Sequence, residues 1–381
     1  MSVTITKPSI NIREKLSQLE RPIGINGAAL MATNTPQDAF SLIGARNRNR
    51  IINGDMRLDQ RNNGSAVTFL TSTSGQTYTV DRWDGTKNGN GKAFTIQRSG
   101  TAPVGFTSSL LFTVTTASST ASGDYNLVRQ QIEGYNVADL MWGTANAKPV
   151  TLSFWVRSSV TGTYSVSLVI QYQGNYPATY TVNSANTWEY KTITVPGPTS
   201  GTWPTDNTAG LAIMFDMGIG STYSTTTNTW TYGQNVFGGS GVTKITETNG
   251  ATWYITGVQL EEGKVATPFE YRSYGQELAL CRRYFEVIAR AGAYYNSFFL
   301  CRADSVSSAL TVYSFKVSKR VSPVMTVSGT SYMYNSAGTP ATITSYANVD
   351  TGTEGGRLSF TGMSGLTVND CFHVDLGSGF S

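Results

Sequence analysis

Alternation of apolar and polar residues with a period of two dominates the middle of the chain. Within VTLSFWVR (residues 150–157) it places Leu152, Phe154 and Val156 on one face of a predicted strand and Trp155 on the other. Four more segments carry strand patterns: 164–172, 188–195, 211–216 and 253–260. Turn-forming pairs such as Asn-Gly and Pro-Gly separate these segments. Many short strands with such turns predict a central antiparallel jelly-roll sandwich over residues 51–272.

Residues 1–50 carry a helical pattern instead. Apolar residues recur there at alternating spacings of four and three: Ile12, Leu16, Leu19 and Ile23. This is the seam of a short coiled coil, with Asn11 and Glu14 as a capping box at its start. A seam of about two heptads cannot hold a coil alone, so it must pack on copies of itself or on another protein. We therefore interpret residues 1–50 as a short helical arm for docking and oligomerisation.

Residues 273–381 begin with a second helical pattern. Between Tyr274 and Val287, Leu278, Cys281 and Phe285 fall at helical spacing. Short strand patterns follow at 292–302, 310–317, 324–328 and 371–376. The sequence therefore predicts a short linker helix followed by a small C-terminal β-sandwich. The whole chain is expected to be mainly β.

Composition supports this fold class and excludes several kinds of partner. Charged residues make up only 14% of the chain, whereas Gly numbers 39 and Tyr 20, so hydroxyl groups rather than charges cover the surface. The net charge is +4, and the densest basic stretch, Arg46–Arg50, lacks interleaved aromatic residues. The start of the chain carries no apolar stretch of signal-peptide or bilayer-spanning length. We expect a protein that is made and kept soluble, with no nucleic-acid partner and no membrane insertion.

Candidate catalytic residues are few. The best local candidates for a catalytic carboxylate pair are Asp81 and Asp84 in VDRWDG, and the adjacent Arg82 would hold Asp81 ionised. A structural ion pair is therefore favoured over catalysis. His373 stands in the last strand pattern with no nucleophile elbow upstream, so a structural role is favoured there too. The sequence predicts no catalytic residue. The three cysteines form no CxxC pair and are interpreted as reduced structural thiols.

Aromatic residues offer a different chemistry. Sugar recognition needs flat aromatic faces against the apolar side of a pyranose ring, with amides and hydroxyls for its OH groups. Trp155 and Trp253 stand within strand patterns and are expected in the core. Tyr176, Trp203 and Trp230 are flanked by Pro or by polar residues of predicted loops, so we expect them to be exposed and name them as candidate glycan-binding residues.

A recurring pattern of motifs along residues 45–330 resembles a family of tail-fibre-like structural proteins of bacteriophages and prophages. The motifs follow one another in order: IINGDMRLDQRN (51–62), YTVDRW (78–83), LSFWVRSS (152–159), VQLEEGKVATPFEYRSYGQELALCRRYFE (258–286) and FKVSKRVSPVMTVSG (315–329). The N-terminal arm is similar to the virion-anchoring arms that precede such modules. The resemblance implies a trimeric fibre attached to a particle.

The NGD motif of the opening strand and the ITGVQLEEG motif of the closing strand also resemble carbohydrate-binding jelly rolls attached to glycan-degrading enzymes. Such modules often hold a calcium ion near the closing strand, but Thr256 and Gly257 stand where they often have paired aspartates. We predict no cofactor and no metal. Calcium is the alternative, with hard oxygen ligands from Asp55, Glu261 and Glu262.

These observations lead to one functional hypothesis and two alternatives. The leading hypothesis is a non-enzymatic virion protein of tail-fibre type, on the exterior of the particle, made in the bacterial cytoplasm. Its homotrimer would attach by residues 1–50 to other virion proteins and recognise a host surface glycan. The first alternative is a purely structural virion protein, such as a head fibre, collar or decoration protein. The second is a carbohydrate-binding module of a larger enzyme system, which the docking arm argues against.

Overall fold

The computed structural model describes residues 48–72, 74–170, 172–288, 297–326, 331–334 and 340–376. The described residues from Asn49 onward belong to one compact unit. The predicted seam residues Ile12, Leu16, Leu19 and Ile23 lie outside the described residues, so the helical docking arm stays a prediction. The predicted domain boundary at residue 272 stays one as well.

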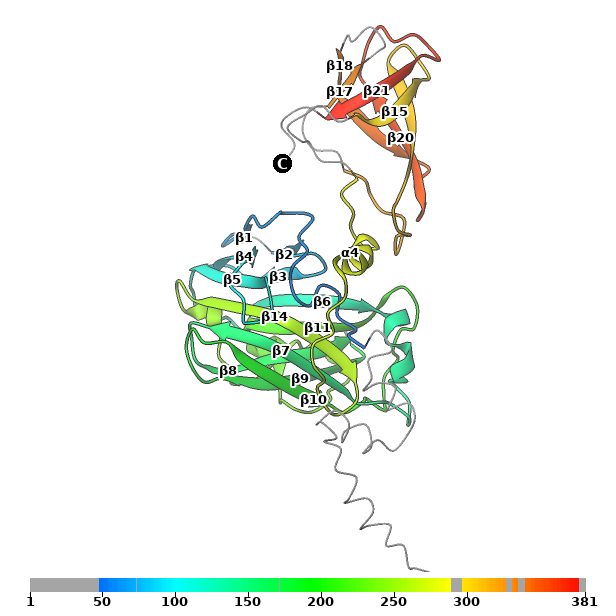
Figure 1. The fold of residues 1–381 in the computed structure, drawn as a ribbon. Helices are drawn as coiled ribbons and strands as arrows, with labels where there is room; N and C mark the ends of the chain where they lie inside the picture. Colours follow the sequence, from blue (N-terminus) through cyan, green and yellow to red (C-terminus); the bar gives the residue numbers. More distant parts are fainter. Residues whose placement is uncertain are drawn as a thin grey trace, which may run out of the picture. The chain divides into compact units, whose positions relative to one another are not determined.

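Two six-stranded antiparallel sheets form a sandwich (Figure 1). The first sheet has the order β1 (Val67–Phe69), β4 (Ala93–Ser99), β5 (Ser109–Thr116), β14 (Thr252–Glu262), β7 (Val150–Ser158) and β10 (Glu189–Val195). The second sheet has the order β2 (Gly75–Tyr78), β3 (Asp84–Asn88), β6 (Tyr125–Glu133), β11 (Ala209–Ile219), β8 (Gly162–Ile170) and β9 (Gly174–Val182). This confirms the predicted mainly β fold with a central antiparallel jelly-roll sandwich.

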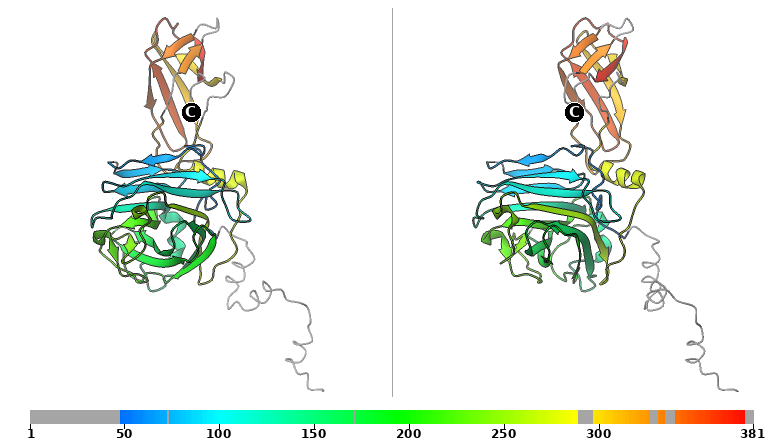
Figure 2. Two further views of the ribbon diagram at one scale, coloured as in Figure 1. Left: turned by 90° about the vertical axis from the view of Figure 1, so that its left-hand side faces the viewer. Right: turned by 60° about the vertical axis from the view of Figure 1, so that its left-hand side comes forward.

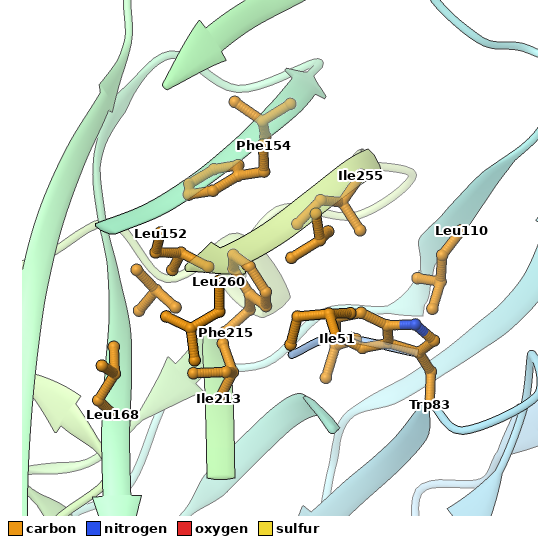
Figure 3. Close-up of a cluster of buried hydrophobic side chains, with 14 of the residues drawn as sticks. Ile51, Trp83, Leu110, Leu152, Phe154, Leu168, Ile213, Phe215, Ile255 and Leu260 are labelled. Atoms are coloured by element: carbon orange, nitrogen blue, oxygen red, sulfur yellow. The ribbon is translucent and has the colours of Figure 1, made fainter. Parts of the chain in front are cut away.

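The core lies between the two sheets, where the period-two pattern directs its apolar residues. Leu152, Phe154 and Val156 of β7 are fully buried. Figure 3 shows Phe154 of the first sheet near Phe215 of the second, and their ring centroids lie 5.3 Å apart. Trp253 is fully buried, as expected. The core position expected for Trp155 is wrong: it points to the outer face, where its ring lies 5.4 Å from that of Tyr190.

The NGD motif and the closing strand meet in this core. The backbone N–H of Val258 donates to the carbonyl of Gly54 at 2.9 Å. A Cβ on Gly54 would lie 2.2 Å from the carbonyl oxygen of Val258, so only glycine permits this approach. The Asn53 amide donates to the carbonyls of Leu58 and Asp81. The two motifs therefore form one structural joint that closes the jelly roll.

The linker helix α4 (Tyr274–Arg282) completes the joint. Ser273 caps it, accepting a hydrogen bond from the N–H of Gln276, and the helix ends before the predicted Val287. Cys281 is buried against Ile52 and Leu58 of the opening segment. Figure 2 shows α4 beside the first strands of the jelly roll. The stretch 258–287 thus ends the jelly roll and packs against its opening segment, which carries Ile52 and Leu58.

Short elements connect the strands: η1 (Gly134–Asn136), η2 (Ala138–Leu140), η3 (Ser221–Tyr223), η4 (Ile245–Glu247), β12 (Ser224–Thr225) and β13 (Gly238–Gly239). β12 and β13 pair in parallel, and Gly239 of β13 donates its N–H to Ser165 of β8 at 3.0 Å. We call residues 221–241 the strap. Phe237 and Gly239 lie over the outer face of the second sheet, and residues 228–231 run along its edge strand β9.

The C-terminal β-unit has its own core. Its antiparallel sheet has the order β18 (Pro340–Ile343), β17 (Ser331–Tyr334), β21 (Cys371–Leu376), β15 (Ser297–Ala303), β16 (Ser308–Ser314), β20 (Gly355–Thr361) and β19 (Ser345–Val349). Met333, Leu358 and Phe360 are among its buried side chains. The strand predicted at 324–328 is absent from its described part, 324–326. His373 lies in β21 opposite Tyr334, with the two rings stacked 5.5 Å apart.

All three cysteines are free thiols. Cys281 and Cys301 are buried, as the structural interpretation requires, whereas Cys371 is exposed. No helix in the described part of the chain is long and apolar enough to cross a bilayer.

Candidate functional site

The outer face of the second sheet carries an unusual mixture of side chains. Cross-strand partners share a face of a sheet, and the register pairs Asp84 with Arg129, and Arg129 with Met214. Their neighbours Val128 and Phe215 are buried in the sandwich core. Asp84, Arg129 and Met214 therefore point away from the core, to the side over which the strap passes.

This face is hollowed into a cavity of about 380 Å³, which we call the outer-face groove. Its lining comes from four strands and the strap: Thr86, Tyr125, Leu127, Arg129, Gln131, Val169, Ile170, Ala209, Ala212, Met214 and Phe237. The apolar members Leu127, Val169 and Met214 are buried and form a separate apolar cluster outside the sandwich core. The size is at the lower end of the range of small-ligand pockets.

Aromatic rings form one wall of the groove. The ring of Phe237 lies 5.4 Å from that of Tyr125, edge to face. Tyr223 stacks on Phe237 with 5.4 Å between centroids and 13° between planes, and the N–H of Phe237 donates to the carbonyl of Tyr223 at 2.8 Å. The strap therefore supplies Phe237 to the wall, and Tyr223, which is not part of the lining, supports the Phe237 ring.

Polar groups lie on the same face. Arg129 Nε lies 3.2 Å from both carboxylate oxygens of Asp84, and Thr86 Oγ1 donates to Asp84 Oδ1 at 2.7 Å. Burial raises the pKa of Asp84, and the Arg129 guanidinium opposes that rise. Arg129 meets Asp84 through Nε, and its side chain lines the groove. Gln131, two residues further along β6, adds an amide to the lining.

A buried carboxylate holds the strap on the sheet. Ser165 Oγ donates to Asp216 Oδ2 at 3.0 Å and accepts from the N–H of Gly239 in the strap at 3.0 Å. A Cβ on Gly238 would lie 2.6 Å from Asp216 Oδ2, so glycine is needed at this crossing. Burial raises the pKa of Asp216 to about 7.

The aromatic residues predicted from the sequence come together, but not on an open surface. Tyr176 and Trp203 lie 5.3 and 5.6 Å from Trp230, between ring centroids. The exposure predicted for Tyr176 and Trp203 is wrong, because only 7% and 9% of their surfaces are accessible. Residues 174–182 form strand β9 rather than a loop, and Tyr176 points into the core opposite Leu168. Trp230 is half-buried. Their glycan-binding role stays a prediction.

The candidate catalytic carboxylates are both tied into the fold. Asp84 is held by Arg129, as described above. Asp81 accepts a hydrogen bond from Gln60 Nε2 at 2.7 Å, and burial raises its pKa. The expectation that Arg82 keeps Asp81 ionised is wrong. The Arg82 guanidinium instead lies 3.3 Å from the ring centroid of Tyr284 and donates to the carbonyl of Gln131.

A larger cavity, of about 800 Å³, lies beside α4 and is lined in part by charged residues. Four of these charged side chains form ion pairs: Arg283 Nε lies 2.8 Å from Glu133 Oε1, and Lys319 Nζ lies 2.6 Å from Glu286 Oε2. Side chains engaged in this way hold the chain after α4 in place, so we assign this cavity to the joint rather than to a ligand.

The carboxylates considered for calcium do not form a ligand set. Asp55 pairs with Arg57 at 3.0 Å, and Glu262 pairs with Lys148 at 3.0 Å. Glu261 accepts from the hydroxyl of Thr267 at 2.6 Å. Within the described ranges, no cluster of three His, Cys, Asp or Glu side chains has metal-binding geometry.

Sequence reasoning missed the outer-face groove. The usable signal lies in YNLVRQQ (125–131), where Tyr125, Leu127, Arg129 and Gln131 alternate with core residues. An outward face that contains a tyrosine, an arginine and a glutamine is chemically suited to a ligand rather than only to water.

No family model and no curated protein matches the chain. Among solved structures, the enzymatically active domain of tailspike protein 4 of bacteriophage CBA120 matches 56% of this chain and 21% of its own, with a TM-score of 0.30 and 13% identity.

Two carbohydrate-binding modules match in the same way. TmCBM61 in complex with β-1,4-galactotriose has a TM-score of 0.28 and 8% identity, over 57% of this chain and all of its own. The family 11 module from Clostridium thermocellum, in complex with a β-1,3-1,4-mixed-linked tetrasaccharide, has a TM-score of 0.26 and 13% identity, over 51% of this chain and all of its own. Likenesses of this size carry no argument about function, which must come from the residues of this chain.

Proposed function

We propose that the jelly roll recognises a surface glycan in the outer-face groove. One observation carries the proposal: Tyr125 and Phe237 line the groove together with an apolar floor and Arg129, which pairs with Asp84. A pyranose ring has an apolar CH face and a rim of hydroxyls, and this groove offers a partner for each.

The polar side of the groove suits hydroxyl recognition. Arg129 presents charged N–H donors whose direction is fixed by Asp84, so little side-chain freedom is lost on binding. Gln131 supplies both a donor and an acceptor. The groove is open and amphipathic, which favours part of an oligosaccharide over a small apolar ligand.

We further propose that the protein is a non-enzymatic virion component of tail-fibre type, on the exterior of a phage particle. The motif resemblance along residues 45–330 supports this role, and the engagement of Asp81 and Asp84 in the fold favours binding over hydrolysis. In the same proposal, residues 1–50 attach a homotrimer to other virion proteins. Three copies of a weak site would increase avidity without new contacts.

Host-cell binding tests this function. The purified full chain would be added to host cells before and after periodate oxidation of their surface polysaccharide. We expect saturable binding that periodate abolishes. Equal binding before and after oxidation would instead point to a protein receptor.

A purely structural virion protein is the second candidate, because jelly rolls also serve as plain architecture. It predicts no binding to cells in either state, together with particles that fail to assemble when the chain is deleted. Assembly of normal particles that no longer adsorb to cells would favour the glycan-binding fibre.

A further inference from the structure

A second cavity lies among the loops at one end of the jelly roll. It has a volume of about 350 Å³ and is lined by Val137, Ala138, Met141, Trp142, Thr144, Asn146, Trp203, Pro204 and Thr205. Its lining comes from the loop after β6 and the loop after β10. We call it the loop-end cavity.

Two tryptophan rings build its wall, and the indole N–H of each ring is already hydrogen-bonded. Trp142 and Trp203 meet edge to face, with centroids 4.9 Å apart. The indole N–H of Trp142 donates to the carbonyl of Lys148 at 2.8 Å, and that of Trp203 donates to the carbonyl of Ser200 at 3.1 Å. Each ring is therefore fixed in orientation by its own hydrogen bond to a backbone carbonyl, and what the rings offer to the cavity is apolar.

Trp230 supports this wall from behind. Its ring lies 5.7 Å from that of Trp142 and 5.6 Å from that of Trp203, and its indole N–H donates to the carbonyl of Pro196 at 2.7 Å. A wall of three mutually packed rings is preorganised, so binding against it orders little that is not already ordered.

The rim of the cavity is polar and uncharged. Thr144, Asn146 and Thr205 are exposed at its edge, and no residue of the lining carries a charge. Thr144 holds its own loop by donating to the carbonyl of Met141 at 2.7 Å. Fixed aromatic surface with amide and hydroxyl groups at the edge suits a neutral sugar ring and disfavours a charged ligand.

The structure also connects the two cavities. Ile170 at the end of β8 lines the outer-face groove. The turn that follows β8 carries Gln173, whose Oε1 accepts from the N–H of Thr202 at 3.0 Å. Thr202 directly precedes Trp203. One turn therefore joins the end of the groove to the loop that supplies Trp203.

We propose that the loop-end cavity binds one uncharged pyranose ring of the same glycan, as a second subsite beside the outer-face groove. The proposal rests on the proposed glycan function and gives it a ligand class: a chain with a neutral residue beyond the segment in the groove. It also gives the predicted Trp203 and Trp230 a role, with Trp203 in the wall and Trp230 behind it.

Indole NMR signals provide a selective test, because tryptophans line the loop-end cavity and none lines the outer-face groove. The full chain would be labelled with ¹⁵N-tryptophan, and the Trp142 and Trp203 signals assigned with Trp142→Phe and Trp203→Phe. Methyl glycosides of glucose, galactose, mannose and N-acetylglucosamine would be titrated, with methyl glucuronoside as the charged comparison.

Two substitutions separate cavity binding from loop damage. Ala138 is exposed and lines the cavity, so Ala138→Trp fills it without removing a contact. Ala145 is an exposed neighbour outside the lining, so Ala145→Trp is the matched control. We expect at least one neutral glycoside to shift both indole signals in the wild type and in Ala145→Trp. We expect neither signal to shift in Ala138→Trp, and neither to shift when the glucuronoside is titrated.

The possible outcomes distinguish the two proposals. Neutral glycosides that bind but leave the indole signals of Trp142 and Trp203 unmoved would overturn the second subsite and leave the groove standing. Indole shifts that persist in Ala138→Trp would overturn it as well. No binding by any glycoside, together with no adsorption to host cells, would overturn both.

Discussion

The hydroxyl of Ser165 donates a hydrogen bond of 3.0 Å to the carboxylate of Asp216 between neighbouring strands β8 and β11, and both residues are fully buried. The same Ser165 oxygen accepts from the strap, so this pair fixes the segment that carries Tyr223 and Phe237. A carboxylate under the groove wall makes that wall sensitive to pH.

The direction of this sensitivity follows from the pKa of Asp216, which burial raises from 3.8 to about 7. Lys244 and hydrogen bonds from Ser165 and Gly218 oppose the rise without cancelling it. A raised pKa means that the folded state binds the proton more tightly than the unfolded state. Asp216 therefore destabilises the fold progressively as pH rises from about 4 to about 7, by at most about 1.4 kcal/mol per pH unit.

Asp216→Asn should remove this slope, because asparagine has no charge to bury. We expect the variant to gain stability relative to the wild type as pH increases from 5 to 8, measured by urea unfolding. Asp206→Asn is the control: Asp206 is exposed and its pKa is lowered by the Thr208 hydroxyl, so it stays ionised throughout that range. A stability difference between Asp216→Asn and wild type that does not change with pH would contradict this account.

Gly54 should tolerate no side chain. A Cβ there would lie 2.2 Å from the backbone oxygen of Val258, and this backbone belongs to a central strand that cannot move freely. Gly54→Ala should therefore destabilise the jelly roll by roughly 2–3 kcal/mol. Gly100→Ala is the matched control, because nothing lies within 4 Å of a Cβ at Gly100. Similar urea midpoints for the two variants would show that the NGD joint is looser than described.

Arg283 and Glu133 should be coupled. The guanidinium binds both carboxylate oxygens, at 2.8 and 2.9 Å, and Glu133 is buried. Arg283→Met removes the cation that pairs with this buried carboxylate and should destabilise the fold by about 1–3 kcal/mol, whereas adding Glu133→Gln should recover part of the loss. A double-mutant cycle by urea unfolding measures the coupling. Strictly additive effects would show that the two side chains do not interact.

The Arg283–Glu133 pair should change stability with pH in the opposite direction from Asp216. Burial raises the pKa of Glu133, but hydrogen bonds from Arg283 and Tyr284 outweigh it and lower the pKa below 4.5. The stabilisation is therefore present above about pH 4.5 and lost as pH falls below it. The wild type and Arg283→Met should differ less in stability at pH 3 than at pH 6.

The sandwich could be predicted because period-two alternation is a local property. Side chains two residues apart share one face of a strand, which is why Leu152, Phe154 and Val156 all point inward. The helix start at Ser273–Tyr274 follows from ordinary capping. The helix end was predicted too late, at Val287, because nothing in the local pattern marks Arg282 as its last residue.

The aromatic positions could not be predicted in this way. Pro177 suggested a loop around Tyr176, but β9 is an edge strand, and an edge strand tolerates a residue that lacks an N–H. Trp203 is covered by Trp142, which is remote in sequence. The groove depends on a strap that brings Phe237 to Tyr125, and no local pattern records that contact.

Binding of host surface polysaccharide to groove variants tests the central claim most directly. Phe237→Ala removes one ring of the wall, and Ala209→Trp obstructs the groove from an exposed lining position while leaving every wall residue in place. Ala185→Trp, at an exposed turn outside the groove, is the control. By equilibrium titration of the full chain, we predict that both groove variants raise the Kd roughly tenfold or more while Ala185→Trp leaves it unchanged. Folded groove variants that bind the polysaccharide as tightly as the wild type would contradict glycan recognition in this groove.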